Sequence, residues 1–222
     1  MFRIVCLVIG YVLGMFQTSY IYGKVHGIDI REHGSGNAGT TNMMRTMGTK
    51  AGLITFAGDV LKTFAAIWLC VFIFRNLYPD IIPLIKCYAA AGAILGHNFP
   101  FYLNFKGGKG IACTAGFVIS LDPVMTAVGI IVFFSIFFTT HYVSLGSIMV
   151  YVTLIIEFAV FGAFHLFLFK GVPDSAVMES CLIALFLTVM ALYKHRENFK
   201  RLISGTEKKT YLKNQNPEIK EK

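Results

Sequence analysis

Long apolar segments follow one another along almost the whole chain, and they constrain its fold more than any other feature. Polar, glycine- or proline-containing, or charged stretches bound each segment, and most segments approach the ~20 residues that a helix needs to cross a bilayer. The segments cover residues 4–23, 51–74, 84–104, 111–121, 123–138, 146–169 and 177–193. No stretch alternates as the strands of a membrane barrel do. We therefore expect an all-α, polytopic bundle of seven transmembrane helices.

The composition excludes an ordinary soluble domain. Of 222 residues, 55% are hydrophobic and 14% are charged, and the mean hydropathy is +0.64. Such values are typical of integral membrane proteins. Segment 111–121 is too short to cross about 30 Å of hydrocarbon, so we expect a half-helix enclosed by the rest of the bundle.

Basic residues are distributed unevenly between the two sides of the predicted bundle. With the N-terminus outside, fifteen Lys and Arg residues lie on the inner side, and only Arg3, Arg75, Lys86 and Lys170 lie outside. The positive-inside rule predicts this asymmetry. The C-terminus is then cytoplasmic.

The chain divides into one integral membrane domain, residues 1–205, and a basic polar tail, residues 206–222. We expect the tail to be disordered or to lie on lipid headgroups. The first segment carries one basic residue and no clear cleavage site, so we interpret it as a retained span with a polar break at residues 17–19.

The net charge of +8 does not indicate a nucleic-acid partner, because the cations border membrane segments instead of alternating with exposed aromatics. Anionic headgroups and phosphorylated substrates fit better. The five cysteines form no CxxC pair and are interpreted as small core residues.

Two glycine-rich, cationic loops border the apolar segments. One covers residues 34–42, with Arg45 just beyond it, and the other covers residues 105–110, with Lys106 and Lys109. Glycines let backbone N–H groups turn around an anion, while hydroxyl and cationic side chains supply further donors. Both loops lie on the predicted inner side, which favours phosphate binding at the membrane surface.

Other interpretations of these loops are weaker. Residues 34–39 match GxGxxG, but they follow a membrane segment and a polar linker, not a strand. The second loop lacks the first glycine and the Ser/Thr of a nucleotide-binding P-loop, since Leu103 and Gly110 occupy those positions. The remaining alternative is that the glycines only make turns and the cations only anchor helix ends.

A third polar cluster ends the last apolar segment. His195 and Asn198 are three residues apart and share one helical face. Ser144, in the connection after the fifth segment, lies on the same predicted side. The alternatives are a C-cap role for His195 and an N-cap role for Ser144.

Asp59 and Lys62 are charged residues inside the second segment, at i and i+3. Unpaired charges are costly in lipid, so we expect a buried ion pair on the floor of the site, with a direct catalytic role as the alternative. We expect His97 to support the loop that follows it. The histidines lack metal-ligand spacing, and neither a metal nor another cofactor is expected.

Three stretches, Gly34–Gly52, Gly96–Thr114 and His195–Glu207, resemble the signature motifs of the bacterial acyl-phosphate:glycerol-3-phosphate acyltransferase family, PlsY. Residues 59–62 and 142–145 resemble its secondary motifs. The order, the spacing and the seven-span layout agree over nearly the whole chain. The departures, Ala38, Thr40, Met43, Met44, Met47 and Cys113, remove no donor and no required glycine.

The resemblance implies transfer of a fatty acyl group from acyl phosphate to the 1-hydroxyl of glycerol 3-phosphate, an early step of phospholipid biosynthesis. The products are lysophosphatidic acid and inorganic phosphate. Coenzyme A and acyl carrier protein are not direct donors. It implies a multi-pass protein of the bacterial inner membrane with its site facing the cytoplasm, and a monomer is our working expectation.

The resemblance also implies residue roles. The residues that it assigns to phosphate contacts and to the reacting centre are Ser35, Arg45, Lys109, His195 and Asn198. The residues that it assigns to substrate binding are Gly36, Asn37, Thr41, Gly107, Gly108, Gly110 and Ser144. The three glycines of the second loop are assigned to binding of acyl phosphate. Glu207 resembles the family's structural glutamate. His195 is the candidate general base, and the alternative proton acceptor is the phosphate of glycerol 3-phosphate.

Two other functions would use the same cations. A transporter for a phosphorylated solute needs a polar path to both faces, whereas the candidate residues collect on one side. A non-catalytic scaffold that binds anionic lipid leaves the set of Ser144, His195 and Asn198 unexplained.

Overall fold

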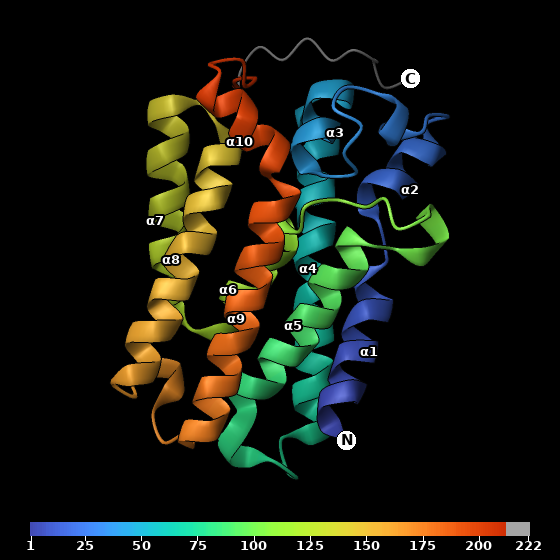
Figure 1. Ribbon diagram of the computed structural model, residues 1–222. Coiled ribbons are helices and arrows are strands. Elements are labelled where there is room, and N and C mark those ends of the chain that lie inside the picture. The colour runs from blue at the N-terminus through green and yellow to red at the C-terminus, as the bar shows by residue number, and fades with distance from the viewer. Residues whose placement is uncertain (212–222) are drawn as a thin grey trace.

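The computed structural model describes residues 1–211, and all its regular elements are helical (Figure 1). The α-helices are α1 (Phe2–Gly14), α2 (Thr18–Val25), α3 (Thr40–Met47), α4 (Thr49–Phe74), α5 (Ile82–Asn98), α6 (Ile111–Leu121), α7 (Pro123–Thr140), α8 (Val143–Ala163), α9 (Asp174–Lys194) and α10 (Arg196–Ile203). Short 3-10 turns lie at Ile30–Glu32, Pro79–Ile81, Phe101–Leu103 and Phe167–Phe169. The all-α prediction is confirmed. Residues 212–222 of the predicted tail lie outside the described part.

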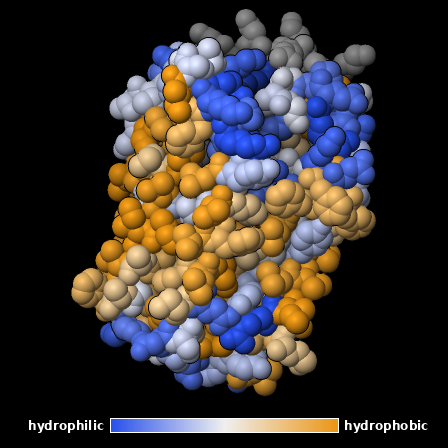
Figure 2. Space-filling view, in the orientation of Figure 1, coloured by the Kyte–Doolittle hydropathy of each residue, from blue (hydrophilic) through white to orange (hydrophobic). Residues whose placement is uncertain are grey.

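Six helical stretches within residues 1–211 are long and apolar enough to cross a membrane. They cover residues 2–25, 49–74, 79–103, 123–140, 143–163 and 174–194. Figure 2 shows the matching surface, a broad apolar zone between two polar ends. The fourth expected segment, residues 111–121, forms α6, which has 11 residues. It is mostly buried and packs against α4, α5 and α7, as predicted for a short helix enclosed by protein.

Local chemistry sets the helix boundaries. Asp122 caps α7 by accepting a hydrogen bond from the Val124 N–H at 2.7 Å, and Pro123 occupies the first turn. Gly48, with φ of 93°, separates α3 from α4. The first apolar run is broken between α1 and α2, where the buried Gln17 amide donates to the His97 carbonyl at 2.7 Å. The polar break expected at residues 17–19 thus lies between Gly14 and Thr18, and residues 2–25 remain one candidate membrane span.

The core lies between the long helices. Cys6, Cys70, Cys87 and Cys113 are buried free thiols in it, and Cys181 packs half-buried against its edge. The interpretation of the cysteines as core residues is confirmed for the four buried ones.

Helices α1 and α5 pack with their backbones in close contact. Each carries two glycines four residues apart, Gly10 and Gly14 on α1 and Gly92 and Gly96 on α5. A Cβ atom at any of these positions would overlap the backbone of the opposite helix. Small residues at this spacing let membrane helices approach closely, so these glycines fix the α1–α5 pair on which the loop after α5 rests.

Gly92→Ala is expected to destabilise the protein by about 1–3 kcal/mol, because the added methyl group overpacks the contact with α1. The matched control is Gly129→Ala on α7, where an added Cβ would have its nearest neighbour at 4.0 Å. Thermal melting in detergent checks both. Equal melting temperatures for the two variants would contradict the close α1–α5 contact.

Candidate active site

Three helix N-termini meet at one cavity of about 100 Å³. Its walls include Thr40 and Thr41 from the start of α3, Ile111 and Ala112 from the start of α6, and Ser144 from the start of α8. The junction of α9 and α10 completes the wall. A helix N-terminus carries a partial positive charge and free N–H groups, so the backbone alone makes this cavity favourable for an anion.

Most of the predicted site residues share this cavity. Those that line it are Ser35, Asn37, Thr41, Arg45, Lys109, Gly110, Ser144, His195 and Asn198. Gly36 lines an adjoining cavity of about 500 Å³, together with Ser35, Arg45 and Lys109. Gly107 and Gly108 do not line either cavity. The three polar clusters of the sequence are thus brought together.

Asn42 shapes the first glycine-rich loop. Its side-chain oxygen accepts a hydrogen bond from the Ser35 N–H at 2.8 Å, and its amide donates to the carbonyls of Ile30 and His33. Gly34 and Gly36 have φ of 60° and 70°, in the left-handed region that favours glycine. The loop therefore holds Ser35 and Asn37 at the cavity edge.

The second glycine-rich loop differs from its expected role. The N–H groups of Gly107 and Gly108 donate to the carbonyls of Asn98 and His97, at 3.2 and 3.1 Å, and do not turn toward the cavity. A side chain at either position would overlap His97. The glycines thus allow a close approach to the end of α5, which places Lys109 and the left-handed Gly110 (φ of 84°) at the start of α6. Binding of acyl phosphate by these N–H groups stays a prediction.

Glu207 joins the second and third clusters. Its carboxylate accepts hydrogen bonds from Ser144 Oγ at 2.8 Å and Asn198 Nδ2 at 2.7 Å through Oε1. Through Oε2 it accepts one from Arg201 Nε at 2.7 Å. Asn198 Oδ1 in turn accepts from the Lys109 ammonium group. A single carboxylate thus orients the amide, hydroxyl and guanidinium groups of the wall, and the amide orients the lysine.

The site has an excess of positive charge. Burial, reinforced by the nearby Arg201 charge, lowers the pKa of Lys109 to about 8. Burial also opposes ionisation of Glu207, but the hydrogen bonds from Asn198, Arg201 and Ser144 outweigh it and hold its pKa below the usual value. Arg45 and Arg201 line the same cavity, so they and Lys109 give three cations beside the Glu207 carboxylate. The other carboxylate in the lining, that of Asp59, is paired with Lys62. An anionic ligand would complete the charge balance.

His195 is buried at the C-cap of α9. Its Nδ1 lies 2.8 Å from the Ala191 carbonyl. A carbonyl only accepts, so this bond assigns the proton to Nδ1 and leaves a lone pair on Nε2. Burial lowers the pKa of His195 to about 4. The imidazole is therefore neutral at pH 7 and has one nitrogen ready to accept a proton.

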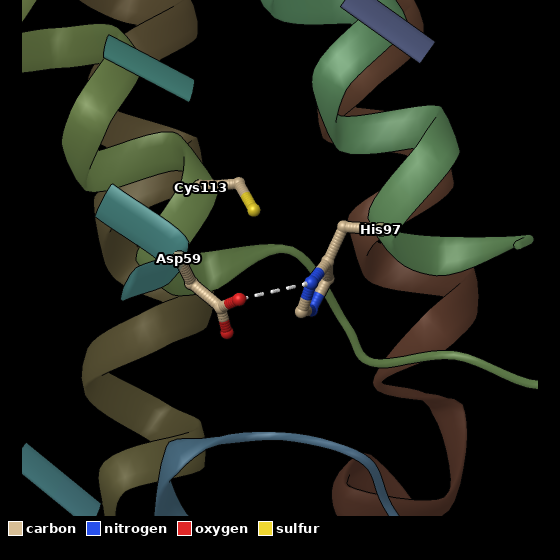
Figure 3. Close-up of side chains that lie close together, drawn as sticks. All are labelled: Asp59, His97 and Cys113. Atoms are coloured by element: carbon tan, nitrogen blue, oxygen red, sulfur yellow. Dashed lines mark ion pairs between the residues drawn. The ribbon is translucent and has the colours of Figure 1, made fainter. Parts of the chain in front are cut away.

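A buried ion-pair network forms the floor of the cavity. Lys62 Nζ lies 2.8 Å from Asp59 Oδ1 and 2.9 Å from His97 Nδ1, which confirms the predicted Asp59–Lys62 pair. Figure 3 shows Asp59 and His97 facing each other, with the Cys113 thiol nearby. Asp59 Oδ1 lies 3.6 Å from His97 Nδ1. These three side chains have metal-ligand chemistry, but the ammonium group of Lys62 already neutralises the carboxylate and bonds the imidazole. His97 also accepts the Gly108 N–H through its carbonyl, so it supports the loop as predicted.

Arg201 and Ser147 are cavity residues that sequence reasoning missed. Both follow a predicted site residue at i+3, Arg201 after Asn198 and Ser147 after Ser144. Residues three apart share a helical face. Extending each predicted face by one turn would have found them.

Comparisons with known proteins agree with this geometry. The protein-family model for glycerol-3-phosphate acyltransferase matches residues 4–205 of this chain. The glycerol-3-phosphate acyltransferase of Clostridioides difficile is 41% identical over 93% of this chain and 94% of its own length. That of Alkaliphilus metalliredigens is 40% identical over 94% and 96%.

Solved structures agree as well. The crystal structure of PlsY, an integral membrane glycerol 3-phosphate acyltransferase, in its glycerol 3-phosphate form, superposes with a TM-score of 0.78 and 28% identity. The match covers 94% of this chain and 96% of that one. The lysophosphatidic acid form gives a TM-score of 0.76. The family resemblance of the motifs is confirmed, and the chain belongs to the glycerol-3-phosphate acyltransferase family.

Proposed function

We propose that the protein transfers a fatty acyl group from acyl phosphate to the 1-hydroxyl of glycerol 3-phosphate, releasing lysophosphatidic acid and inorganic phosphate. The observation that carries this proposal is the shared cavity. There, three helix N-termini and the cations Arg45, Lys109 and Arg201 converge beside the neutral His195. Family membership supports the glycerol 3-phosphate acceptor, and the resemblance to PlsY supports the acyl-phosphate donor.

Two adjoining cavities fit a reaction between two phosphate-bearing substrates. The smaller cavity and the larger one have six wall residues in common, namely Ser35, Asn37, Arg45, Lys109, Arg201 and Glu207. A group that lies between two phosphate positions neutralises both and brings the reacting atoms together. Lys109 and Arg45 are placed for this role.

The proposed reaction is one acyl substitution. The 1-hydroxyl oxygen attacks the carbonyl carbon of acyl phosphate, and the bond from that carbon to the phosphate oxygen breaks. The phosphate leaves with the bonding electrons, and the hydroxyl proton passes to His195 Nε2. Lys109 and the helix N-termini stabilise the charge that develops on the carbonyl and leaving oxygens. Bound glycerol 3-phosphate is anionic and raises the pKa of His195, which makes it a stronger base in the complex.

We place the protein in the bacterial inner membrane with seven crossings, the N-terminus outside and the site facing the cytoplasm. In Figure 1 the start of α1 lies at the opposite end of the bundle from α3 and α10, which carry site residues. Termini on opposite sides require an odd number of crossings. The six long spans and the short helix α6 give seven if α6 is counted as a crossing of its own beside α7. In the topology predicted from the sequence, most basic residues lie on the same side of the membrane as α10. This distribution is expected for the cytoplasmic face.

Phosphate release tests the proposal directly. The purified protein, in detergent or lipid, is supplied with palmitoyl phosphate with and without glycerol 3-phosphate, and lysophosphatidic acid is identified by mass spectrometry. We expect release that depends on glycerol 3-phosphate. A parallel reaction with palmitoyl-CoA tests the donor: equal turnover with the thioester contradicts acyl-phosphate specificity, and no product from a folded preparation with either donor contradicts the acyltransferase assignment.

The pH profile should report Lys109. Because its pKa is about 8, its ammonium charge is present below pH 8 and is lost above it, so kcat/KM should fall on the alkaline side of pH 8. The phosphate groups of the substrates titrate near pH 6, which makes the alkaline limb the more informative one. Lys109→Arg should remove that limb, since arginine stays charged. An unchanged limb in this variant would assign the titration to another group.

A further inference from the structure

The chain reverses direction immediately after α10. Gly205, with φ of 70°, allows a Schellman turn in which the Gly205 N–H donates to the Leu202 carbonyl at 3.2 Å and the Thr206 N–H to the Arg201 carbonyl at 2.8 Å. This reversal returns Glu207 to the side of Arg201. Residues 208–211 therefore run back over the site and not away from it.

Residues 208–211, which we call the strap, cross to the turn between α7 and α8. The Thr210 N–H donates to the His141 carbonyl at 2.9 Å, and His141 itself is held in a left-handed conformation with φ of 60°. The rings of His141 and Tyr211 pack with their centroids 4.6 Å apart. Thr210 is 3% exposed. The strap is thus anchored beyond residue 205, where the family match ends.

The strap contacts Arg45 with two acceptors. Arg45 Nη2 donates to the Lys208 carbonyl at 2.9 Å and to Thr210 Oγ1 at 2.6 Å. Both hydrogens of this nitrogen are then used, and the Nε and Nη1 hydrogens remain for a ligand. A long guanidinium side chain loses considerable rotamer entropy when it is fixed. The strap fixes it before the substrate arrives.

We propose that the strap is a positioning element for Arg45, and that Thr210 is its positioning residue. The side-chain and backbone acceptors hold the guanidinium at the cavity wall in the direction that a substrate phosphate requires. The inference rests on the proposed function, because the phosphates between which Arg45 is placed, that of glycerol 3-phosphate among them, are those of the proposed substrates. It adds a part of the site that lies in a segment predicted as a polar tail.

Two truncated proteins test the strap. One ends after Glu207, so it lacks the strap but keeps the Glu207 network, and its matched control ends after Tyr211. Losing charge-assisted hydrogen bonds that preorganise a group should weaken binding of glycerol 3-phosphate by about tenfold. We expect KM for glycerol 3-phosphate to rise by that factor in the shorter protein with kcat little changed. The control should match the full chain in both constants.

A pair of point variants separates positioning from folding. Thr210→Val removes the hydroxyl acceptor and nearly keeps the shape, whereas Thr210→Ser keeps the acceptor. We expect KM for glycerol 3-phosphate to rise in Thr210→Val and to stay near that of the unmodified protein in Thr210→Ser. The melting temperatures of both variants should equal that of the unmodified protein. Unchanged KM in Thr210→Val and in the shorter truncation would overturn the proposal, as would a fall in kcat and melting temperature without a KM change.

Calorimetric binding of glycerol 3-phosphate to the same proteins keeps this inference separate from the proposed function. If the full chain shows no turnover, the proposed function fails. The strap is then judged by affinity alone, with about tenfold weaker binding without residues 208–211 as the expected result. Equal affinity of the two truncated proteins contradicts it.

Discussion

Lys109→Ala is expected to lower kcat/KM by about a hundredfold or more, because one preorganised donor to a developing negative charge is typically worth about 2.7–4 kcal/mol of barrier. The ammonium group of Lys109 lies at the wall shared by the two cavities and is held by Asn198 Oδ1. Alanine removes both the charge and the group that Asn198 orients. Steady-state rates of phosphate release measure the effect.

Lys106→Ala is the matched control for this variant. Lys106 belongs to the same loop and carries the same charge, but it is exposed and does not line either cavity. We expect its kcat/KM to stay near that of the unmodified protein. Comparable losses in the two variants would mean that the loop acts only through its general positive potential, and near-normal activity of Lys109→Ala would contradict the site assignment.

The helical architecture could be predicted from the sequence because bilayer crossing imposes a local rule, a sufficient run of apolar residues. Even α6 was foreseen, since eleven apolar residues before Asp122 are too few to cross alone. The polar residues 17–19 indicated the break between α1 and α2, but the geometry of this break could not be predicted. It depends on Gln17 reaching the His97 carbonyl, 80 positions away in the chain.

The meeting of the polar clusters was also predictable, because the topology predicted from the basic residues puts them on one side. Directions of individual groups were not. The N–H groups of Gly107 and Gly108 turn to the end of α5, a result of tertiary packing that glycine content does not encode. The course of residues 208–211 over the site was missed for a similar reason. Their polar composition indicated a tail that is disordered or lies on lipid headgroups, whereas they make hydrogen bonds to His141 and Arg45.

His195→Gln is expected to lower kcat by about a hundredfold or more, because positioned general bases contribute 10²–10⁴-fold to such reactions. The Nδ1 bond to Ala191 presents Nε2 as a proton acceptor, and burial keeps the ring neutral at pH 7. Glutamine keeps much of the size and the hydrogen-bonding capacity of the imidazole. It cannot take up the hydroxyl proton, so the loss should fall on kcat while KM for glycerol 3-phosphate is nearly retained.

His165→Gln provides the control, since His165 lies in the connection after α8, is exposed, and pairs with Asp174 away from both cavities. Its kcat should be unchanged. If His195→Gln keeps its turnover as well, the proton must go elsewhere, and the phosphate of glycerol 3-phosphate is the acceptor that the reaction itself supplies. A rise in KM at constant kcat would then define His195 as a binding residue, whereas a fall in kcat at constant KM assigns it the proton transfer.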